Sequence, residues 1–499
     1  MKIIFRLSWV LLLFCLFFQP YSVQSQEGQK LIDTARELAS GGQFQKAEKM
    51  LSKALGNADE NNKRAILWEK ERIRRIRLDY NKTEKDILEQ CNSRIKNSEK
   101  EELKTWEAEG KFDARIIDGE KRYVSPSVSN LAKRYPNIRK RFKSYSTKDP
   151  WGEKVLRMAR RIQKASETSD SSYLVPLRLK GKHTLIPKPD YFKTGEMVHA
   201  WIPFPRQLPY QKDIKILNTS MDPTSIDDPE SPIRSVYFET EAKGKKPPEF
   251  SIEYEFTRYA VYSKVNPEKV EPYGNDETYE KYTSEEPPNI IFTKELKDLA
   301  KKIVGDEQNP YLKGKKIYEW ISTNIVYSFA REYSTLLNIP MYVYENRYGD
   351  CGQLGLLFIT LCRIEKVPAA WRSGWECMGG EDWGMHDWCA VYVKPYGWIP
   401  VDPFMGVWVV HESTLLPIHK QFLLDFYYGN LDPWRLQANA KNNAELKPEK
   451  KHFRSETVDF QRGEIETESQ NLYFGEFRWS MRLTGIEELP GEEKTKKKE

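Results

Sequence analysis

The chain of 499 residues has few cysteines, no large excess of charge of either sign and a low hydrophobic share. Six cysteines are too few for a disulfide-based scaffold, and 27 glycines and 29 prolines exclude a collagen-like repeat. Lys and Arg number 79 and Asp and Glu 73, so the net charge of +6 gives no signature of nucleic-acid binding. Aromatic residues make up 13% of the chain, which excludes a wholly disordered protein. The length predicts about three domains.

Long apolar runs are also missing beyond the N-terminus. Residues 7–18 (LSWVLLLFCLFF) follow two basic residues and form an apolar run of about twelve residues, shorter than the ~20 that a membrane helix needs. This pattern is typical of a signal peptide, with cleavage after Ser25. A lipid anchor on Cys15 is the alternative, but the bulky Phe14 before it does not fit a lipidation site. We expect residues 1–25 to be removed and the mature protein to be secreted or periplasmic, without membrane insertion.

Removal of the signal peptide leaves an odd number of cysteines in a compartment where thiols tend to pair. At least one thiol is therefore unpaired. A reactive cysteine and a buried cysteine that acts as a small hydrophobic side chain both fit this count. The remaining cysteines are Cys91, Cys351, Cys362, Cys377 and Cys389.

Hydrophobic periodicity divides the mature chain into regions of different structure. Apolar residues recur at helical spacing around Ala35 and Leu51 and resemble one tetratricopeptide-like helix pair without further copies. Four arginines within residues 72–77 then indicate a solvated helix face or, alternatively, a patch for a protein partner. Alternation with a period of two begins near residue 173. The expected order is a signal peptide (1–25), a helical region (26–110), a mostly helical connector (111–172), a β-sandwich-like domain (173–266), a linker (267–289), a core of α+β class (290–430) and a C-terminal extension with strands and a charged tail (431–499).

The segment around Cys351 carries the clearest chemical signal. Gly349 and Asp350 before it favour a turn, and the apolar residues within 354–361 form one face of a helix. Cys351 is therefore expected at a helix N-terminus, where free N–H groups and the helix dipole favour the thiolate, the form that attacks carbonyl groups. Its backbone N–H is also a candidate to hold an oxyanion.

A histidine and an aspartate follow on two strand-like segments. Residues 386–393 and 398–402 are joined by a turn around Lys394, which predicts an antiparallel hairpin. Pairing about Lys394 brings His386 and Asp402 nearly opposite each other on one face. A cysteine at a helix start, a histidine and a carboxylate that orients the histidine make up the nucleophile, base and orienting group of cysteine acyl-transfer chemistry.

These segments resemble the transglutaminase-like superfamily. The resemblance rests on GDCG at 349–352, MHDWCAVYV at 385–393 and GWIPVDP at 397–403, in this order, and it covers about residues 290–430. It implies a papain-like core, preceded here by the helical region and the β-sandwich-like domain of a secreted bacterial multidomain protein.

The resemblance also implies roles for individual residues. Cys351 would be the nucleophile, His386 the base and then the acid, and Asp402 the orienting group. Members of the family attack a carboxamide carbon, form a thioester and pass the acyl group to water or to an amine. Transglutaminases proper use an upstream tryptophan as a second oxyanion donor, but Trp320 lies in a segment typical of a core helix, so a structural role is expected for it and the second donor stays open.

Other residues near these three have less specific patterns. Trp383 and Trp388 flank His386 in sequence and are candidates to line a substrate groove for the acyl donor, although tryptophans are also common in a core. Cys362 and Cys389 are expected to be structural, because helix and strand geometry place them away from the nucleophile and from the face of His386. The spacing of the cysteines matches no zinc site, so we expect no metal.

The sequence therefore predicts an exported cysteine enzyme that acts on peptide or protein amide bonds and needs no cofactor. Hydrolysis, as in a peptidase or amidase, is favoured over transfer to an amine because an exported enzyme meets abundant water. A cross-linking transglutaminase is one alternative, and a non-catalytic scaffold with a transglutaminase-like core is another. A protein partner on the N-terminal helical region is also expected.

Overall fold

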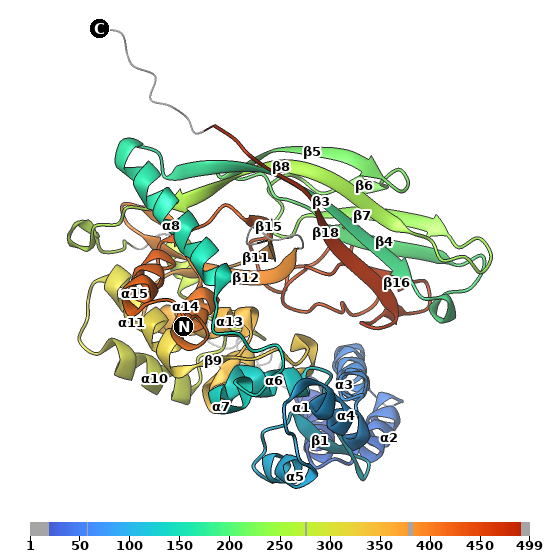
Figure 1. The fold of residues 1–499 in the computed structure, drawn as a ribbon. Coiled ribbons are helices and arrows are strands. Elements are labelled where there is room, and N and C mark those ends of the chain that lie inside the picture. The colour runs from blue at the N-terminus through green and yellow to red at the C-terminus, as the bar shows by residue number, and fades with distance from the viewer. Residues whose placement is uncertain (1–18, 57, 275–276, 378–382, 491–499) are drawn as a thin grey trace, which may run out of the picture. The chain divides into compact units, whose positions relative to one another are not determined.

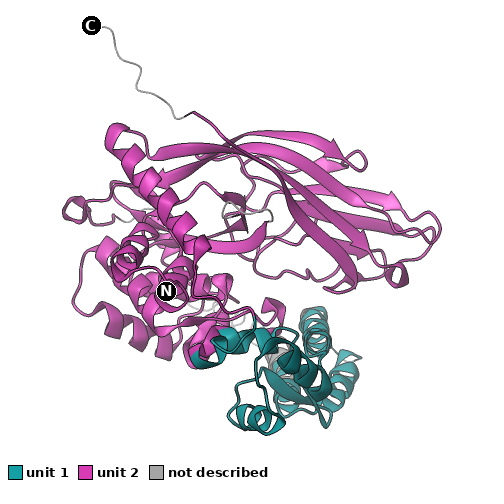
Figure 2. Cartoon of the chain, in the orientation of Figure 1, with its two compact units in different colours: residues 1–132, 137–143 teal, residues 133–136, 144–499 magenta. Residues whose placement is uncertain are grey.

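A computed structural model describes residues 19–56, 58–274, 277–377 and 383–490. The chain forms two compact units, one of residues 1–132 and 137–143 and the other of residues 133–136 and 144–499 (Figure 2). Most of the predicted signal peptide, residues 1–18, lies outside the described residues. No helix in the described part of the chain is both long enough and apolar enough to cross a membrane.

The first unit is built from helices and a small β-hairpin. Ala35, Ala47 and Leu51, which the sequence assigns to apolar helix faces, are buried in one cluster with Phe44 and Ile73. Hydrophobic contacts between neighbouring helices therefore hold this unit together. The elements of this part of the chain are α1 (Gln19–Ser40), α2 (Phe44–Leu55), α3 (Glu60–Asp79), α4 (Glu84–Arg94), α5 (Lys100–Ala108), β1 (Ala114–Ile117), β2 (Glu120–Tyr123), α6 (Ser127–Arg134) and α7 (Pro136–Arg139).

The arginines of α3 do not form the fully solvated face that the sequence predicts. Arg75 has no exposed surface and Arg72 is 7% exposed. Arg72 Nε donates to Glu69 Oε2 at 3.0 Å, and Arg75 Nε donates to Glu71 Oε1 at 2.8 Å. Carboxylates one turn away on the same helix thus compensate the charge of the buried guanidinium groups.

The second unit contains the predicted β-sandwich, made of two antiparallel sheets (Figure 1). One sheet has the strand order β14–β8–β3–β18, with β5 also paired to β8, and the other has the order β17–β16–β4–β7–β6. Buried and half-buried residues alternate along β3, because successive side chains of a strand point to opposite faces. Helix α8 (Pro150–Thr168) packs against β3 and β8. The strands before residue 270 are β3 (Tyr173–Pro187), β4 (Met197–Pro203), β5 (Gln211–Thr219), β6 (Ser225–Ile226), β7 (Ser235–Glu241) and β8 (Phe250–Tyr262).

The predicted α+β core follows, and its sheet has the order β13–β12–β11–β15. Helix α13 is buried from Gly352 to Arg363 and packs against β11 and β12, so it lies in the centre of the core. The elements of the core are α9 (Glu277–Tyr282), α10 (Lys294–Val304), α11 (Pro310–Asn324), β9 (Val326–Tyr327), α12 (Ile339–Asn346), β10 (Tyr348–Gly349), α13 (Cys351–Ile364), β11 (Ala369–Glu376), β12 (Gly384–Val393), β13 (Gly397–Val401), α14 (Pro403–His411) and α15 (Pro417–Phe426).

The last strands of the chain are shared between the sandwich and the core. β18 lies antiparallel beside β3, and β16 lies beside β4, whereas β15 pairs with β11 of the core sheet. Residues 431–490 are therefore not a separate extension, and local periodicity could not show this because the pairing partners are far apart in sequence. The charged tail at 491–499 lies outside the described residues. These strands are β14 (Asn430–Leu431), β15 (Arg435–Asn439), β16 (Glu464–Thr467), β17 (Asn471–Leu472) and β18 (Phe477–Glu488).

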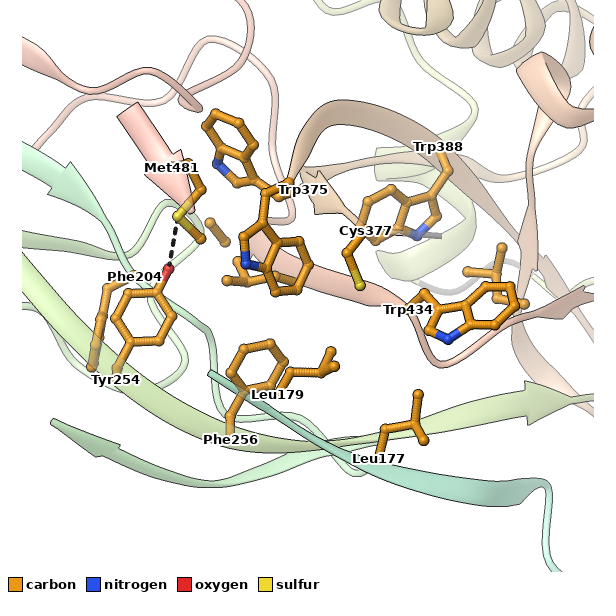
Figure 3. Close-up of a cluster of buried hydrophobic side chains, with 14 of the residues drawn as sticks. Leu177, Leu179, Phe204, Tyr254, Phe256, Trp375, Cys377, Trp388, Trp434 and Met481 are labelled. Atoms are coloured by element: carbon orange, nitrogen blue, oxygen red, sulfur yellow. Dashed lines mark hydrogen bonds between the residues drawn. The ribbon is translucent and has the colours of Figure 1, made fainter. Parts of the chain in front are cut away.

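A hydrophobic cluster fixes the core sheet against the sandwich (Figure 3). Trp375 of β11 and Trp388 of β12 are each 1% exposed. They belong to the same cluster as Leu179 of β3 and Phe256 of β8. Tryptophans bury large apolar areas, so this contact holds the strand that carries His386 firmly in place.

Candidate active site

Cys351 is the first residue of α13, so the prediction of a helix N-terminus is confirmed. Asp350 caps this helix: its Oδ1 accepts a hydrogen bond from the Gln353 N–H at 3.0 Å, and the Gln353 side chain accepts one from the Asp350 N–H at 3.2 Å. The Tyr333 hydroxyl donates to the same carboxyl group at 2.7 Å. The cap therefore fixes Cys351 at the positive end of the helix dipole.

Cys351 differs from the other described cysteines in its exposure. It is partly exposed, whereas Cys91, Cys362, Cys377 and Cys389 are buried, and none of these five forms a disulfide. The structural placement expected for Cys362 and Cys389 is confirmed by their full burial. Among the described cysteines, Cys351 is thus the most exposed.

His386 and Asp402 lie together, as the sequence predicts, although the hairpin register is shifted. Cys389 pairs with Val401, so the turn is centred on Pro395 and not on Lys394. Asp402 therefore lies just beyond β13 and diagonal to His386. Their side chains still meet, because His386 Nε2 is 2.8 Å from Asp402 Oδ2.

Arg435 of β15 holds the Asp402 carboxylate from the other side. Its Nη1 donates to Asp402 Oδ2 at 2.6 Å, and its Nη2 donates to Asp432 Oδ2 at 2.9 Å. Burial opposes ionisation of Asp402, but the charges of His386 and Arg435 outweigh it and bring the pKa of Asp402 to about 2. The carboxylate thus stays ionised and orients the imidazole.

The contact with Asp402 fixes which ring nitrogen of His386 can accept a proton. Since Nε2 faces Asp402, Nδ1 is the ring nitrogen with a lone pair available for a proton. Glu376 Oε2 lies 3.7 Å from Nε2. Burial lowers the pKa of His386, but the Glu376 and Asp402 carboxylates more than offset it and raise that pKa above its usual value. Burial in turn raises the pKa of Glu376 to about 7.

The surroundings of Cys351 contradict the expected preference for the thiolate. Burial, together with the charges of Asp387 and Asp350, raises the pKa of the Cys351 thiol well above its usual range. A helix dipole contributes only about 0.3–1 kcal/mol at an accessible site, so it does not compensate for these effects. The described residues show no hydrogen bond between Cys351 and His386, although the charge of Glu376 acts on both. Catalytic hydrogen bonds are often long in unliganded enzymes.

Two further polar side chains come from the end of the chain and from β12. Cys351 Sγ lies 3.6 Å from Asp387 Oδ2. The Gln461 amide donates to Asp387 Oδ1 at 2.9 Å and to the backbone oxygens of Gly374 and His386, each at 3.0 Å. The sequence analysis missed Asp387 and Gln461, as well as Glu376 and Arg435. Asp387 stands directly after the histidine in the recognised motif, and this position is the one signal that could have marked it.

The two candidate substrate tryptophans occupy different positions. Trp383 is 5% exposed and its ring lies 6.3 Å from that of Phe256 in the sandwich core, which favours a packing role. Trp388 stacks on His386 at 6.0 Å between ring centres. It also lines a cavity of about 320 Å³ together with Arg372 and several aromatic residues. Cys351 and His386 do not line this cavity.

Trp320 packs at the edge of the core, as expected for a structural residue. It contacts the main hydrophobic cluster of the core, and the Arg347 guanidinium lies 5.3 Å from its ring centre. The described residues include no group of three or more His, Cys, Asp or Glu side chains that could hold a metal ion.

Comparison with known proteins adds to this geometry. Residues 297–403 match the family model of the transglutaminase-like superfamily. No curated protein matches the chain significantly. Among solved structures, a candidate cysteine protease from Cytophaga hutchinsonii is 15% identical, with 64% of this chain and 92% of that chain covered and a TM-score of 0.41. The periplasmic domain of TgpA from Pseudomonas aeruginosa is 12% identical, with coverages of 53% and 95% and a TM-score of 0.27. Cys351, His386 and Asp402 all lie within the segment that matches the transglutaminase-like superfamily.

Proposed function

We propose that the chain is an exported cysteine enzyme that acts on amide bonds of peptides or proteins through a thioester on Cys351. The observation that carries this proposal is the 2.8 Å contact between His386 and Asp402, held by Arg435, in a superfamily core whose helix-capped cysteine is accessible. These are the nucleophile, base and orienting group that acyl transfer requires.

The proposed reaction has two acyl-transfer steps. His386 Nδ1 takes the proton of the Cys351 thiol, and Sγ attacks the amide carbonyl carbon while the Cys351 backbone N–H is placed to stabilise the oxyanion. The C–N bond then breaks, and His386 returns the proton to the leaving amine or ammonia. In the second step His386 takes a proton from water, the resulting hydroxide attacks the thioester, and the proton returns to sulfur as the carboxylic acid leaves.

Polypeptide substrates fit the surroundings of the site. We propose that Trp388 supports a substrate side chain, because it stacks on His386 and lines the nearby cavity. The helical first unit is proposed as a surface for a protein partner. None of the steps above needs a cofactor, since the residues described supply the base, the nucleophile and an oxyanion donor.

Water is the proposed acyl acceptor, and one experiment separates the alternatives. The mature chain is incubated with a glutamine-containing peptide and a labelled primary amine, and mass spectrometry measures ammonia release, amine incorporation and backbone cleavage. Hydrolysis predicts ammonia or cleavage without incorporation, and Cys351→Ala must abolish it. Amine incorporation would show a transglutaminase. Absence of all three products across a panel of peptides would overturn the enzyme proposal in favour of a scaffold.

A further inference from the structure

Asp387 lies against the nucleophile, and the reaction described above leaves its role open. Its Oδ2 is 3.6 Å from Cys351 Sγ, and the residue is 1% exposed. The position of Gly352 shows how tightly this carboxyl group fits the first turn of α13. A Cβ atom at Gly352 would lie 2.6 Å from the same Oδ2, so glycine is required for the approach. The second oxygen, Oδ1, accepts a hydrogen bond from Gln461 at 2.9 Å.

The groups around Asp387 are mainly acidic. Asp350 faces it from the cap of α13, and Asp459 and Glu456 face it from the segment before β16. Burial first, and then the charges of Asp459 and Asp350, raise the pKa of Asp387 well above its usual range. The neutral, protonated carboxyl group is therefore the favoured form.

The cation and the hydroxyl group near this cluster, Arg462 and Tyr333, bind acidic neighbours of Asp387. Arg462 forms ion pairs with Glu332 at 2.8 Å and with Glu456 at 3.0 Å. The Tyr333 hydroxyl donates to Asp350. Within the described residues, Asp387 forms hydrogen bonds with Cys351 and Gln461, and neither partner is a cation.

We propose that Asp387 acts as a protonated carboxyl group that donates a hydrogen bond to the Cys351 thiolate, and that loss of this proton switches the nucleophile off. The proposal rests on the nucleophilic role of Cys351 in the proposed function. When His386 takes the thiol proton, Asp387 keeps its own, and its O–H group turns toward the negative sulfur. When Asp387 ionises, a carboxylate faces the sulfur instead, and two like charges at this distance disfavour the thiolate.

The test is the rate of alkylation of Cys351 by iodoacetamide as a function of pH, because alkylation needs the thiolate but no substrate. The mature chain is labelled between pH 5 and pH 10, and the peptide that contains Cys351 is quantified by mass spectrometry. Asp387→Asn is the decisive variant. Its side-chain oxygen can still accept from Gln461, its N–H group can still donate to sulfur, and it cannot ionise. We expect it to react about tenfold faster than the wild type at alkaline pH, which corresponds to a shift of about one unit in the thiol pKa.

Further variants separate the effect of the hydrogen-bond donor at residue 387 from the effect of its negative charge. Asp387→Ala removes both, so we expect it to react more slowly than Asp387→Asn at every pH. Asp298→Asn, a surface change, must leave the profile unchanged. Superimposable profiles of the wild type and Asp387→Asn would overturn the proposal.

If Asp387→Asn does not fold by circular dichroism, Asp459→Asn takes its place. It removes a charge that raises the pKa of Asp387, so suppression of alkylation must begin at a lower pH than in the wild type. An unchanged onset would overturn the proposal. If the chain turns over amides but the Asp387 variants leave the alkylation profile unchanged, this inference alone is refuted. If the alkylation profile is as expected but the chain turns over no amide, the proposed reaction alone is refuted.

Discussion

Replacement of Arg435 by methionine tests whether a buried cation holds the Asp402 carboxylate. Arg435 has no exposed surface and bridges Asp402 at 2.6 Å and Asp432 at 2.9 Å. Removal of one partner from a buried ion pair costs about 3–5 kcal/mol, because the remaining charge stays desolvated. The surroundings of Asp402 lower its pKa from an ordinary 3.8 to about 2. This shift corresponds to a stabilisation of the ionised form by roughly 2 kcal/mol. This contribution is complete above the ordinary pKa and is lost as the pH falls through about 2.

Urea unfolding at pH 7, followed by tryptophan fluorescence, measures the effect on the free energy of unfolding. We expect Arg435→Met to lose about 3–5 kcal/mol relative to the wild type. The matched control is Arg178→Met, which breaks the exposed ion pair with Glu487 and should cost about 0–1 kcal/mol. The deficit of Arg435→Met should shrink at pH 4, because protons can then neutralise the stranded Asp402 carboxylate. Equal effects of the two substitutions at pH 7 would refute the reasoning.

Cys351→Ala should abolish both amide turnover and selective iodoacetamide labelling while circular dichroism stays unchanged; residual turnover would exclude Cys351 as the nucleophile. Glu376→Gln removes a carboxyl group 3.7 Å from His386 Nε2 whose ionised form raises the pKa of His386, so the limb of the pH–rate profile that His386 sets should move to lower pH; a limb that stays in place would contradict this coupling. Gly374→Ala places a Cβ atom against the Leu436 carbonyl of the paired strand and should cost about 1–3 kcal/mol in urea unfolding; a stable variant would show that β11 and β15 can separate without loss.

The parts of the site that could be predicted are those encoded by local signals. Asp350 before an apolar helical face marks the start of α13, and the structure shows this cap. The even spacing of His386 and Asp402 in a hairpin predicted their contact, although the register differs by two residues from the symmetric pairing. The contact survives the shift because the diagonal neighbours of an antiparallel pair are still within reach of long side chains.

The charge state of the nucleophile could not be predicted from the same signals. A helix N-terminus favours the thiolate, but this local effect is small beside burial and two neighbouring carboxyl groups. Asp387 comes to Cys351 through the packing of β12 on α13, which depends on the whole core sheet. Sequence motifs indicate the candidate residues Cys351, His386 and Asp402, whereas tertiary packing brings the other side chains of the site to them and sets the pKa values.

The region after residue 430 shows why the segment that matches the family is not the whole site. Arg435 of β15 compensates the charge of Asp402, and Gln461 holds both Asp387 and the backbone of His386. A chain that ended at residue 403 would keep Cys351, His386 and Asp402 but would leave the buried Asp402 carboxylate without its cation. Because Arg435 is one of the two cations that lower the pKa of Asp402, such a chain would have a higher pKa at Asp402 even if the remaining core strands folded. The C-terminal segments that carry Arg435 and Gln461 are therefore part of the candidate site, together with the motifs that carry the three proposed catalytic residues.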